Sequence, residues 1–240
     1  ASGATTARWN KIANFAPPLV VGVLVIAGWE AFCRVFSIPS YLFPAPSQIA
    51  SVFVSDAPVL MKSLWVTLRV TLIALGLSVV IGSAVAFLFV QSPMIERSLF
   101  PYAIIMQVTP IVAIAPLIII LVKDTQLALV ICATIIAIFP IIANTHFGLT
   151  SVDRGMHELF TLSKASRIQR LTKLEFPAAL PAMMTGFRTA SGLVVVGAII
   201  GDMFFAKGEP GIGTLLDVYR ARLQSDDLIG AIVLASLFGI

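Results

Sequence analysis

Long apolar stretches separated by short polar ones dominate the chain. Four windows contain no Asp, Glu, Lys or Arg: residues 12–29, 70–95, 98–122 and 125–152. Each is close to or above the ~20 residues that a helix needs to cross the hydrocarbon of a bilayer. The windows are continuously apolar, whereas the strands of a membrane barrel alternate in polarity over about 10 residues. The pattern therefore predicts an all-α integral membrane protein.

We expect a single transmembrane domain over residues 1–240, a bundle of about six helices. The predicted spans cover about 12–35, 63–91, 98–121, 126–148, 177–204 and 228–240. The last is short for a span, so we expect the chain to continue beyond Ile240. Between the first two spans, a proline-rich loop should lead into a short amphipathic helix, Gln48–Val54, capped by Ser47.

The third predicted span contains three prolines, Pro101, Pro110 and Pro116. Each removes a backbone donor and bends a helix. Carbonyls freed in this way need partners in the protein or in a wet cavity. We therefore expect one kinked helix in the interior of the bundle.

Two stripes of small residues fall on single helix faces. One is Ser78-x-x-x-Gly82-x-x-x-Ala86, and the other is Gly197-x-x-x-Gly201. Small side chains allow helices in a membrane to approach closely. The stripes predict tight helix contacts, either within the subunit or between two subunits.

The composition agrees with a membrane protein and excludes most other classes. Of the 240 residues, 58% are hydrophobic and 12% are charged, against about 25% charged in ordinary soluble domains. Such a chain cannot hide its apolar surface in one soluble core, which excludes most soluble enzymes, nucleic-acid binders and disordered proteins. The two cysteines form no metal-ligand pattern, so no metal site is expected.

The net charge of +4 indicates orientation rather than nucleic-acid binding. With the N-terminus inside, the inner loops carry eight Lys and Arg side chains and the outer loops six. Five of the eight lie within residues 154–173. We therefore expect the loop 153–175 and the N-terminus to be cytoplasmic.

The loop 153–175 is predicted to form two short helices. Asp153 is a plausible N-cap of the first, and Met156, Leu159, Phe160 and Ser163 share one of its faces. An amphipathic helix with basic flanks fits two environments equally well on physical grounds alone. It lies on anionic lipid headgroups, or it docks to a protein.

The second helix of the loop should start at Arg167. Ser166 and Gln169 have the spacing of a capping box. Pro177 should end this helix, because proline disfavours helical backbone at the preceding Phe176.

This loop resembles the EAA loop of binding-protein-dependent ABC importer permeases. The matching residues are Glu158, Ala165, Ser166, Arg167, Pro177, Ala179, Leu180 and Pro181. Leu159 and Phe160 replace the two alanines of the pattern, and Lys164 replaces its glycine. Glycine there permits a left-handed turn between the helices. Lys164 must turn by another route, or the first helix runs on.

Further motifs are similar to the nitrate/taurine/sulfonate branch of that family, and the resemblance covers about residues 40–240. They are Pro44-x-Pro46-Ser47, Ser92-Pro93, Glu96-Arg97, Pro101, Pro110, Ala115-Pro116-Leu117, Gly186-x-Arg188 and Gly211-x-Gly213.

The resemblance implies a type I ABC importer permease in the bacterial plasma (inner) membrane. Such a subunit forms the pathway for a small solute and works by alternating access, driven by a cytoplasmic ABC ATPase dimer. The residues implied to couple to the ATPase are Glu158, Leu159, Phe160, Lys164, Ala165, Ser166 and Arg167. The chain has no Gly-x-x-x-x-Gly-Lys-Ser/Thr phosphate loop. It should therefore be no enzyme and bind no cofactor, with ATP and Mg on the partner ATPase.

The other implied partners are the lipid bilayer, a second permease and an extracytoplasmic substrate-binding protein. The second permease is either another copy of this chain or a paralogue. The binding protein is expected on the outer loops, including 37–62 and 205–227. Small nitrogen- or sulfur-containing solutes are implied, with vitamin or pyrimidine precursors also open.

Five polar or helix-breaking residues in the spans are candidates for the translocation pathway: Gln107, Thr109, Pro110, Asn144 and Asp202. Each also has a structural explanation. Gln107 and Thr109 can satisfy backbone groups freed by Pro110, and Asn144 can form a hydrogen bond between helices. Asp202 can stand at a helix end, in water beside Lys207.

An ion-gradient-driven secondary transporter is the main alternative function. Such proteins carry intramembrane acids and inverted repeats. Only Asp202 suggests this class, and no internal repeat is evident. A membrane anchor without transport is a second alternative, but it does not explain three prolines in one span.

Overall fold

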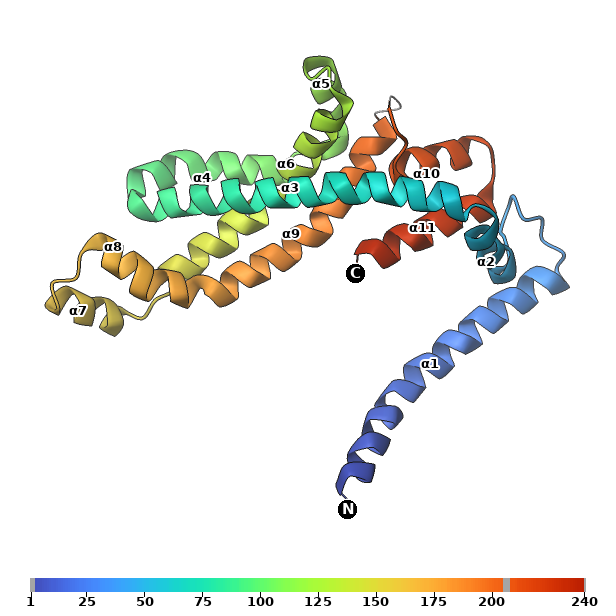
Figure 1. The fold of residues 1–240 in the computed structure, drawn as a ribbon, viewed down its shortest axis with the longest axis horizontal. Coiled ribbons are helices and arrows are strands. Elements are labelled where there is room, and N and C mark those ends of the chain that lie inside the picture. Colours follow the sequence, from blue (N-terminus) through green and yellow to red (C-terminus); the bar gives the residue numbers. More distant parts are fainter. Residues whose placement is uncertain (1–2, 205–207, 240) are drawn as a thin grey trace. The chain divides into compact units, whose positions relative to one another are not determined.

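The computed structural model describes residues 3–204 and 208–239, with the backbone alone for residues 3–16 and Ile119, and in this part of the chain it contains helices and no strand (Figure 1). The elements are α1 Gly3–Val35, α2 Pro46–Ser55, α3 Ala57–Gln91, α4 Pro93–Val108, α5 Ile111–Leu121, α6 Thr125–Thr150, α7 Arg154–Leu162, α8 Arg167–Arg170, the π-helical turn η1 Leu171–Glu175, α9 Phe176–Phe204, α10 Ile212–Ala221 and α11 Ser225–Gly239.

Several of these helices are long and apolar enough to cross a membrane. Among the described residues, the stretches are Pro17–Val35, Ala57–Gln91, Thr125–Thr150 and Arg167–Phe204, and the bent pair Pro93–Val108 and Ile111–Ile118 qualifies as a fifth. The all-α membrane class predicted from the sequence is thereby confirmed. The predicted spans 63–91, 126–148 and 177–204 lie within α3, α6 and α9, and 228–240 corresponds to the 15-residue α11.

The predicted kinked helix 98–121 is replaced by two helices, α4 and α5, which meet at an angle of 97°. The break falls at Thr109 and Pro110, whose ψ angles of 121° and 123° are extended. Pro110 lacks the amide that would continue the helix and pushes Thr109 out of helical backbone. Pro101 and Pro116 remain inside α4 and α5. Three prolines therefore produce one break.

The chain divides into two compact units, Ala1–Leu60 with Val218–Leu234, and Met61–Asp217 with Ala235–Ile240. In the first unit, Glu30 of α1 fixes the start of α2. Its carboxylate accepts hydrogen bonds from the Ser47 amide (3.0 Å) and hydroxyl (2.8 Å), and from Arg34 Nε (2.6 Å). The prediction that Ser47 caps the helix is wrong. The helix begins at Pro46, whose fixed φ suits a first helical position, so Ser47 is free to bond α1.

The same unit contains a pair of neighbouring carboxyl groups, those of Asp56 and Asp227. Asp227, in the first turn of α11 and 9% exposed, accepts a hydrogen bond from Gln224 Nε2 at 3.0 Å. Asp56 follows the end of α2. Burial, the hydrogen bond with Asp56 and the negative charges of Asp226 and Asp56 together raise the pKa of Asp227 to about 6. The Asp227 carboxyl therefore binds a proton at a higher pH than an ordinary aspartate does.

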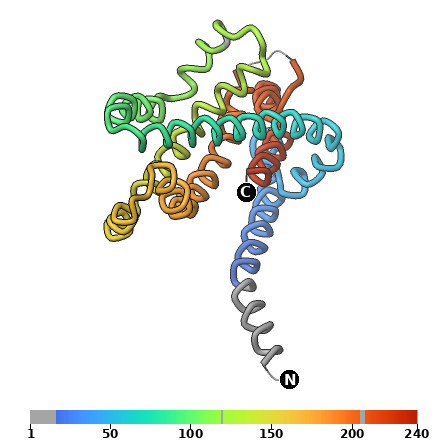
Figure 2. Tube along the Cα trace, turned by 60° about the vertical axis from the view of Figure 1, so that its left-hand side comes forward, coloured from blue at the N-terminus to red at the C-terminus, as the bar shows by residue number. Residues whose placement is uncertain are grey.

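The core of the second unit is the contact between α6 and α9, which run side by side in both views (Figures 1 and 2). A methyl group on Gly197 would come within 2.8 Å of Ala133 Cα, so glycine is required for this approach. Gly201 likewise faces Cys132. On α3, Ser78 donates to the Thr134 carbonyl at 3.5 Å. The two predicted stripes thus both make contacts within the subunit.

Candidate functional site

The segment between α6 and α9 carries an exposed amphipathic helix, α7. Asp153 caps it as predicted, since its carboxylate accepts a hydrogen bond from the Gly155 amide at 2.7 Å. No residue of α7 is buried. Its apolar side chains Met156, Leu159 and Leu162 are 44%, 54% and 82% exposed. Apolar groups held in this way on a charged helix favour a partner surface.

The helix α7 ends in a left-handed turn centred on Lys164, whose φ is +50°. The Ala165 amide donates to the Phe160 carbonyl and the Lys164 amide donates to the Thr161 carbonyl, both at 3.0 Å. This is the Schellman arrangement, in which a glycine usually occupies the left-handed position. Lys164 therefore adopts the left-handed backbone conformation that glycine usually provides, and α7 ends at Leu162.

The second helix starts at Arg167, as predicted. Ser166 Oγ accepts from the Gln169 amide at 3.2 Å, and Gln169 Oε1 accepts from the Ser166 amide at 2.9 Å, which completes the capping box. The prediction that Pro177 ends this helix is wrong, because helical structure continues to Phe204. Proline normally clashes with the carbonyl four residues earlier. Here the π turn Leu171–Glu175 precedes Phe176, and the chain stays helical through Pro177.

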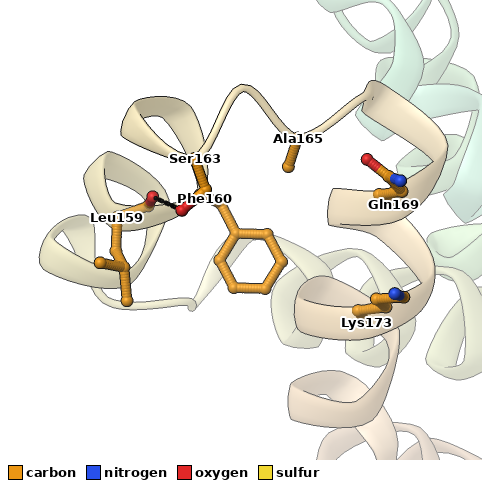
Figure 3. A pocket seen from close by; sticks show the side chains of 6 residues that line it. All are labelled: Leu159, Phe160, Ser163, Ala165, Gln169 and Lys173. Carbon is orange, nitrogen blue, oxygen red and sulfur yellow. Dashed lines mark hydrogen bonds between the residues drawn. The ribbon is translucent and has the colours of Figure 1, made fainter.

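A hollow of about 230 Å³ separates α7 from the second helix (Figure 3). Its lining residues are Leu159, Phe160, Ser163, Ala165, Gln169 and Lys173. Leu159, Phe160 and Ala165 are thus brought together, while Ser166 forms the cap and the Glu158 and Arg167 side chains are exposed on the two helices. The sequence did not single out Lys173, although it lies one turn after Gln169.

The charge on this segment is predominantly positive. Residues 153–175 carry five cationic and three acidic side chains. One acid, Glu175, is buried, with Oε1 3.2 Å from Nε of the half-buried Arg170. The exposed surface is therefore basic around an apolar stripe, which suits a partner with acidic and apolar groups.

The pathway candidates lie at three separate places in the second unit. Thr109 and Pro110 form the α4–α5 break with Gln107 one turn before it, and Thr109 Oγ1 donates to the Ile105 carbonyl at 2.7 Å. Asn144 of α6 lies against Gly186 of α9, and its Nδ2 donates to the Pro140 carbonyl at 2.8 Å.

Asp202 is 4% exposed near the end of α9, and its carboxylate holds the start of α10. It accepts hydrogen bonds from the amides of Thr214 (2.6 Å) and Gly211 (3.4 Å), and Thr214 Oγ1 donates to the Asp202 carbonyl at 3.1 Å. Thr67 of α3 accepts from the Ile212 amide at 3.0 Å. The expectation that Asp202 stands in water is therefore wrong. Lys207, the neighbour expected from the sequence, lies outside the described residues.

The glycines around this carboxylate have no space for side chains. A methyl group on Gly211 would lie 2.7 Å from Asp202 Oδ2, and one on Gly213 would collide with the Ile199 carbonyl. The motif Gly211-x-Gly213 is therefore explained by close packing of the loop on α3 and α9.

The sequence of this chain matches a known protein family. Residues 78–240 match the family described as "Binding-protein-dependent transport system inner membrane component". The chain is 30% identical over 224 residues to a probable ABC transporter permease protein of Haemophilus influenzae, covering 93% of this chain and 90% of the relative. It is 29% identical over 225 residues to the formylaminopyrimidine transport permease protein ThiX of Halalkalibacterium halodurans, covering 93% and 88%.

A third relative comes from the sulfonate branch. The chain is 27% identical over 224 residues to the putative aliphatic sulfonates transport permease protein SsuC of Escherichia coli, covering 92% of this chain and 84% of the relative.

Proposed function

Since the chain belongs to the family of binding-protein-dependent transport system inner membrane components, the permeases of ABC importers, we propose that it lines the membrane pathway of a small solute and is driven by ATP hydrolysis in a partner. The pathway alternates between outward-facing and inward-facing states. ATP and Mg are bound by a cytoplasmic ABC ATPase dimer, and this chain contributes the membrane helices.

The observation that carries the proposal is the exposed helix α7 between the two most closely packed helices of its unit. The cap at Asp153 and the left-handed turn at Lys164 fix its two ends, although no residue of α7 is buried. A surface helix of nine residues does not hold its shape through its own packing, because short isolated helices are marginal in water. A preformed, exposed helix with an apolar stripe favours a docking contact, because its order lowers the entropic cost of binding.

The docking residues in this proposal are Glu158, Leu159, Phe160, Lys164, Ala165, Ser166 and Arg167. Leu159 supplies exposed apolar area, Phe160 and Ala165 shape the hollow, and Ser166 and Lys164 hold the turn. Glu158 and Arg167 are exposed charges of opposite sign.

The solute is a small nitrogen- or sulfur-containing molecule, and an extracytoplasmic binding protein delivers it. The names of several relatives support this class, since they include formylaminopyrimidine, aliphatic sulfonate and nitrate permeases, while another is named as a bicarbonate permease. The binding protein docks on the outer segments 37–62 and 205–227. A second permease, a copy or a paralogue, completes the pathway, and the multi-pass chain has its N-terminus in the cytoplasm of a bacterium.

Co-purification tests the proposal directly. Leu159→Glu places a charge on the apolar stripe of α7, and Thr161→Glu places the same charge on another face of the same helix. We expect a P-loop ATPase subunit to purify with the wild-type chain and with Thr161→Glu, and to be lost with Leu159→Glu. Equal recovery of the ATPase with both variants would exclude α7 as the docking helix.

The secondary-transporter alternative rests on Asp202 alone. Its carboxylate is occupied by the Thr214 and Gly211 amides, so the alternative has no free acid at this position. Uptake that persists after ATP depletion and collapses with an ionophore would favour the secondary transporter.

A further inference from the structure

The turn η1 interrupts an otherwise α-helical run from Arg167 to Phe204. Five consecutive residues, Leu171–Glu175, are π-helical. Such turns are rare, appear mostly as single turns inside α-helices, and are frequent at functional sites. This one stands where the exposed loop joins the first packed residues of α9.

The Arg170–Glu175 ion pair depends on the π turn. The two residues are five apart, and Nε lies 3.2 Å from Oε1. On an α-helix, side chains three and four apart face one another. In a π turn the hydrogen bonds run between residues five apart, so this pair shares a face. Conversion of η1 to α-helix would separate the two charges and leave the buried Glu175 carboxylate without Arg170.

Packing differs sharply on the two sides of the turn. After it, Ala179 and Met183 are buried against Leu149 of α6, and the ring centroid of Phe176 lies 6.1 Å from that of Phe87 on α3. Before it, α7 and α8 contain no buried residue. The turn therefore separates a segment anchored in the core from one exposed to solvent.

A change of register at η1 would reorient everything before it. One residue of α-helix corresponds to a rotation of about 100° and a rise of 1.5 Å. Gln169 and Lys173 line the hollow in the present register (Figure 3). A shift by one residue would rotate Gln169 away from α7 and turn the loop relative to α9.

We propose that Leu171–Glu175 is a register switch that sets the orientation of α7 and α8 relative to α9. Arg170 and Glu175 are the positioning residues that hold the π register. The proposal rests on the coupling role of the loop proposed above. ATPase closure pulls on α7, and the register of η1 decides how that pull is delivered to α9.

The experiment uses the complete transporter in nanodiscs and, separately, the isolated chain. Glu175→Gln removes the charge and keeps the side-chain size. Deletion of Thr172 leaves four residues where five make the π turn, and Thr172→Ala is its matched control at this exposed position. Spin labels on Leu162→Cys and Met184→Cys, both exposed, report the distance between α7 and α9 in a chain whose buried cysteines, Cys33 and Cys132, are replaced by alanine.

We expect Glu175→Gln and the Thr172 deletion to shift the label distance, while Thr172→Ala keeps the wild-type value. In the complete transporter, solute moved per ATP should fall about 5-fold or more, the lower end of ordinary coupling between sites, with the ATPase still bound. A wild-type distance and wild-type coupling in Glu175→Gln would overturn the register switch, and this variant decides the matter even if the deletion fails to fold. Absence of any ATPase from the wild-type complex would instead refute the proposed function, and the distances in the isolated chain would still test the switch.

Discussion

Replacing Asp227 with asparagine should remove the contribution of Asp227 to the pH dependence of stability between weakly acidic and neutral pH. The pKa of Asp227 is raised from 3.8 to about 6 by burial, by the hydrogen bond with Asp56 and by the neighbouring negative charges. The folded chain therefore binds a proton more tightly than the unfolded chain. This contribution to stability is complete below about pH 4 and is lost as the pH rises through about 6.

The magnitude follows from the shift. Each pKa unit corresponds to about 1.36 kcal/mol, so a shift of about two units gives at most about 3 kcal/mol between the two ends of the pH window. For a chain of this size, 1 kcal/mol moves the midpoint of thermal unfolding by about 2–4 °C. The wild-type midpoint should thus fall by up to about 6–12 °C between about pH 4 and pH 7.

The assay is thermal unfolding in detergent, followed by tryptophan fluorescence. Trp29 reports on the same unit, since its ring centroid lies 5.2 Å from that of Phe43. The asparagine side chain would be neutral throughout, so we expect Asp227→Asn to have a flatter profile than the wild type and a higher midpoint at neutral pH. Asp56→Asn should also flatten the profile, because its amide can donate to the charged Asp227. The same slope in wild type and Asp227→Asn would refute the raised pKa of Asp227 as the cause of the pH dependence.

Three further predictions concern the loop and the glycines. Glu158→Lys combined with Phe160→Ala should uncouple ATP hydrolysis from uptake; unchanged uptake and unchanged ATPase recovery in reconstituted vesicles would contradict the docking role. Lys164→Gly should raise the free energy of unfolding by up to about 1 kcal/mol over Lys164→Ala, because glycine adopts the left-handed turn without the Cβ penalty. A lower unfolding midpoint for the glycine variant would argue against this turn. Gly213→Ala should lower the free energy of unfolding by about 1–3 kcal/mol or more through overpacking. Gly22→Ala should be tolerated, because its added methyl group meets nothing within 4 Å. Expression levels and size-exclusion profiles of the two variants test this difference.

Features decided by neighbours in sequence were the predictable part of the site. Asp153 and the Ser166–Gln169 pair cap the helices that were expected, because a cap needs only a short polar side chain and the amides two or three residues away. The apolar spans were predictable for the same reason, since their length and composition alone decide them.

Features decided by distant contacts were not predictable. Pro177 ends a helix by local rules, but the π turn before it is supported by Leu174 and Glu175, which are buried in the fold. Asp202 is bound by amides nine and twelve residues further on. Of three prolines in one apolar window, only Pro110 breaks the helix, at the residue where Thr109 turns to extended backbone.

The hydrogen bonds at Asp202 have a mechanical consequence. They join α9 directly to the start of α10 and, through Thr67, bring α3 to the same point. Three glycines of α9, Gly186, Gly197 and Gly201, pack closely against α6. A displacement of the end of α9 would therefore move the Gly211–Thr214 segment directly, through the hydrogen bonds at Asp202. The end of α9, the start of α10 and Thr67 of α3 are thus held together by hydrogen bonds to a single buried carboxylate and a single hydroxyl.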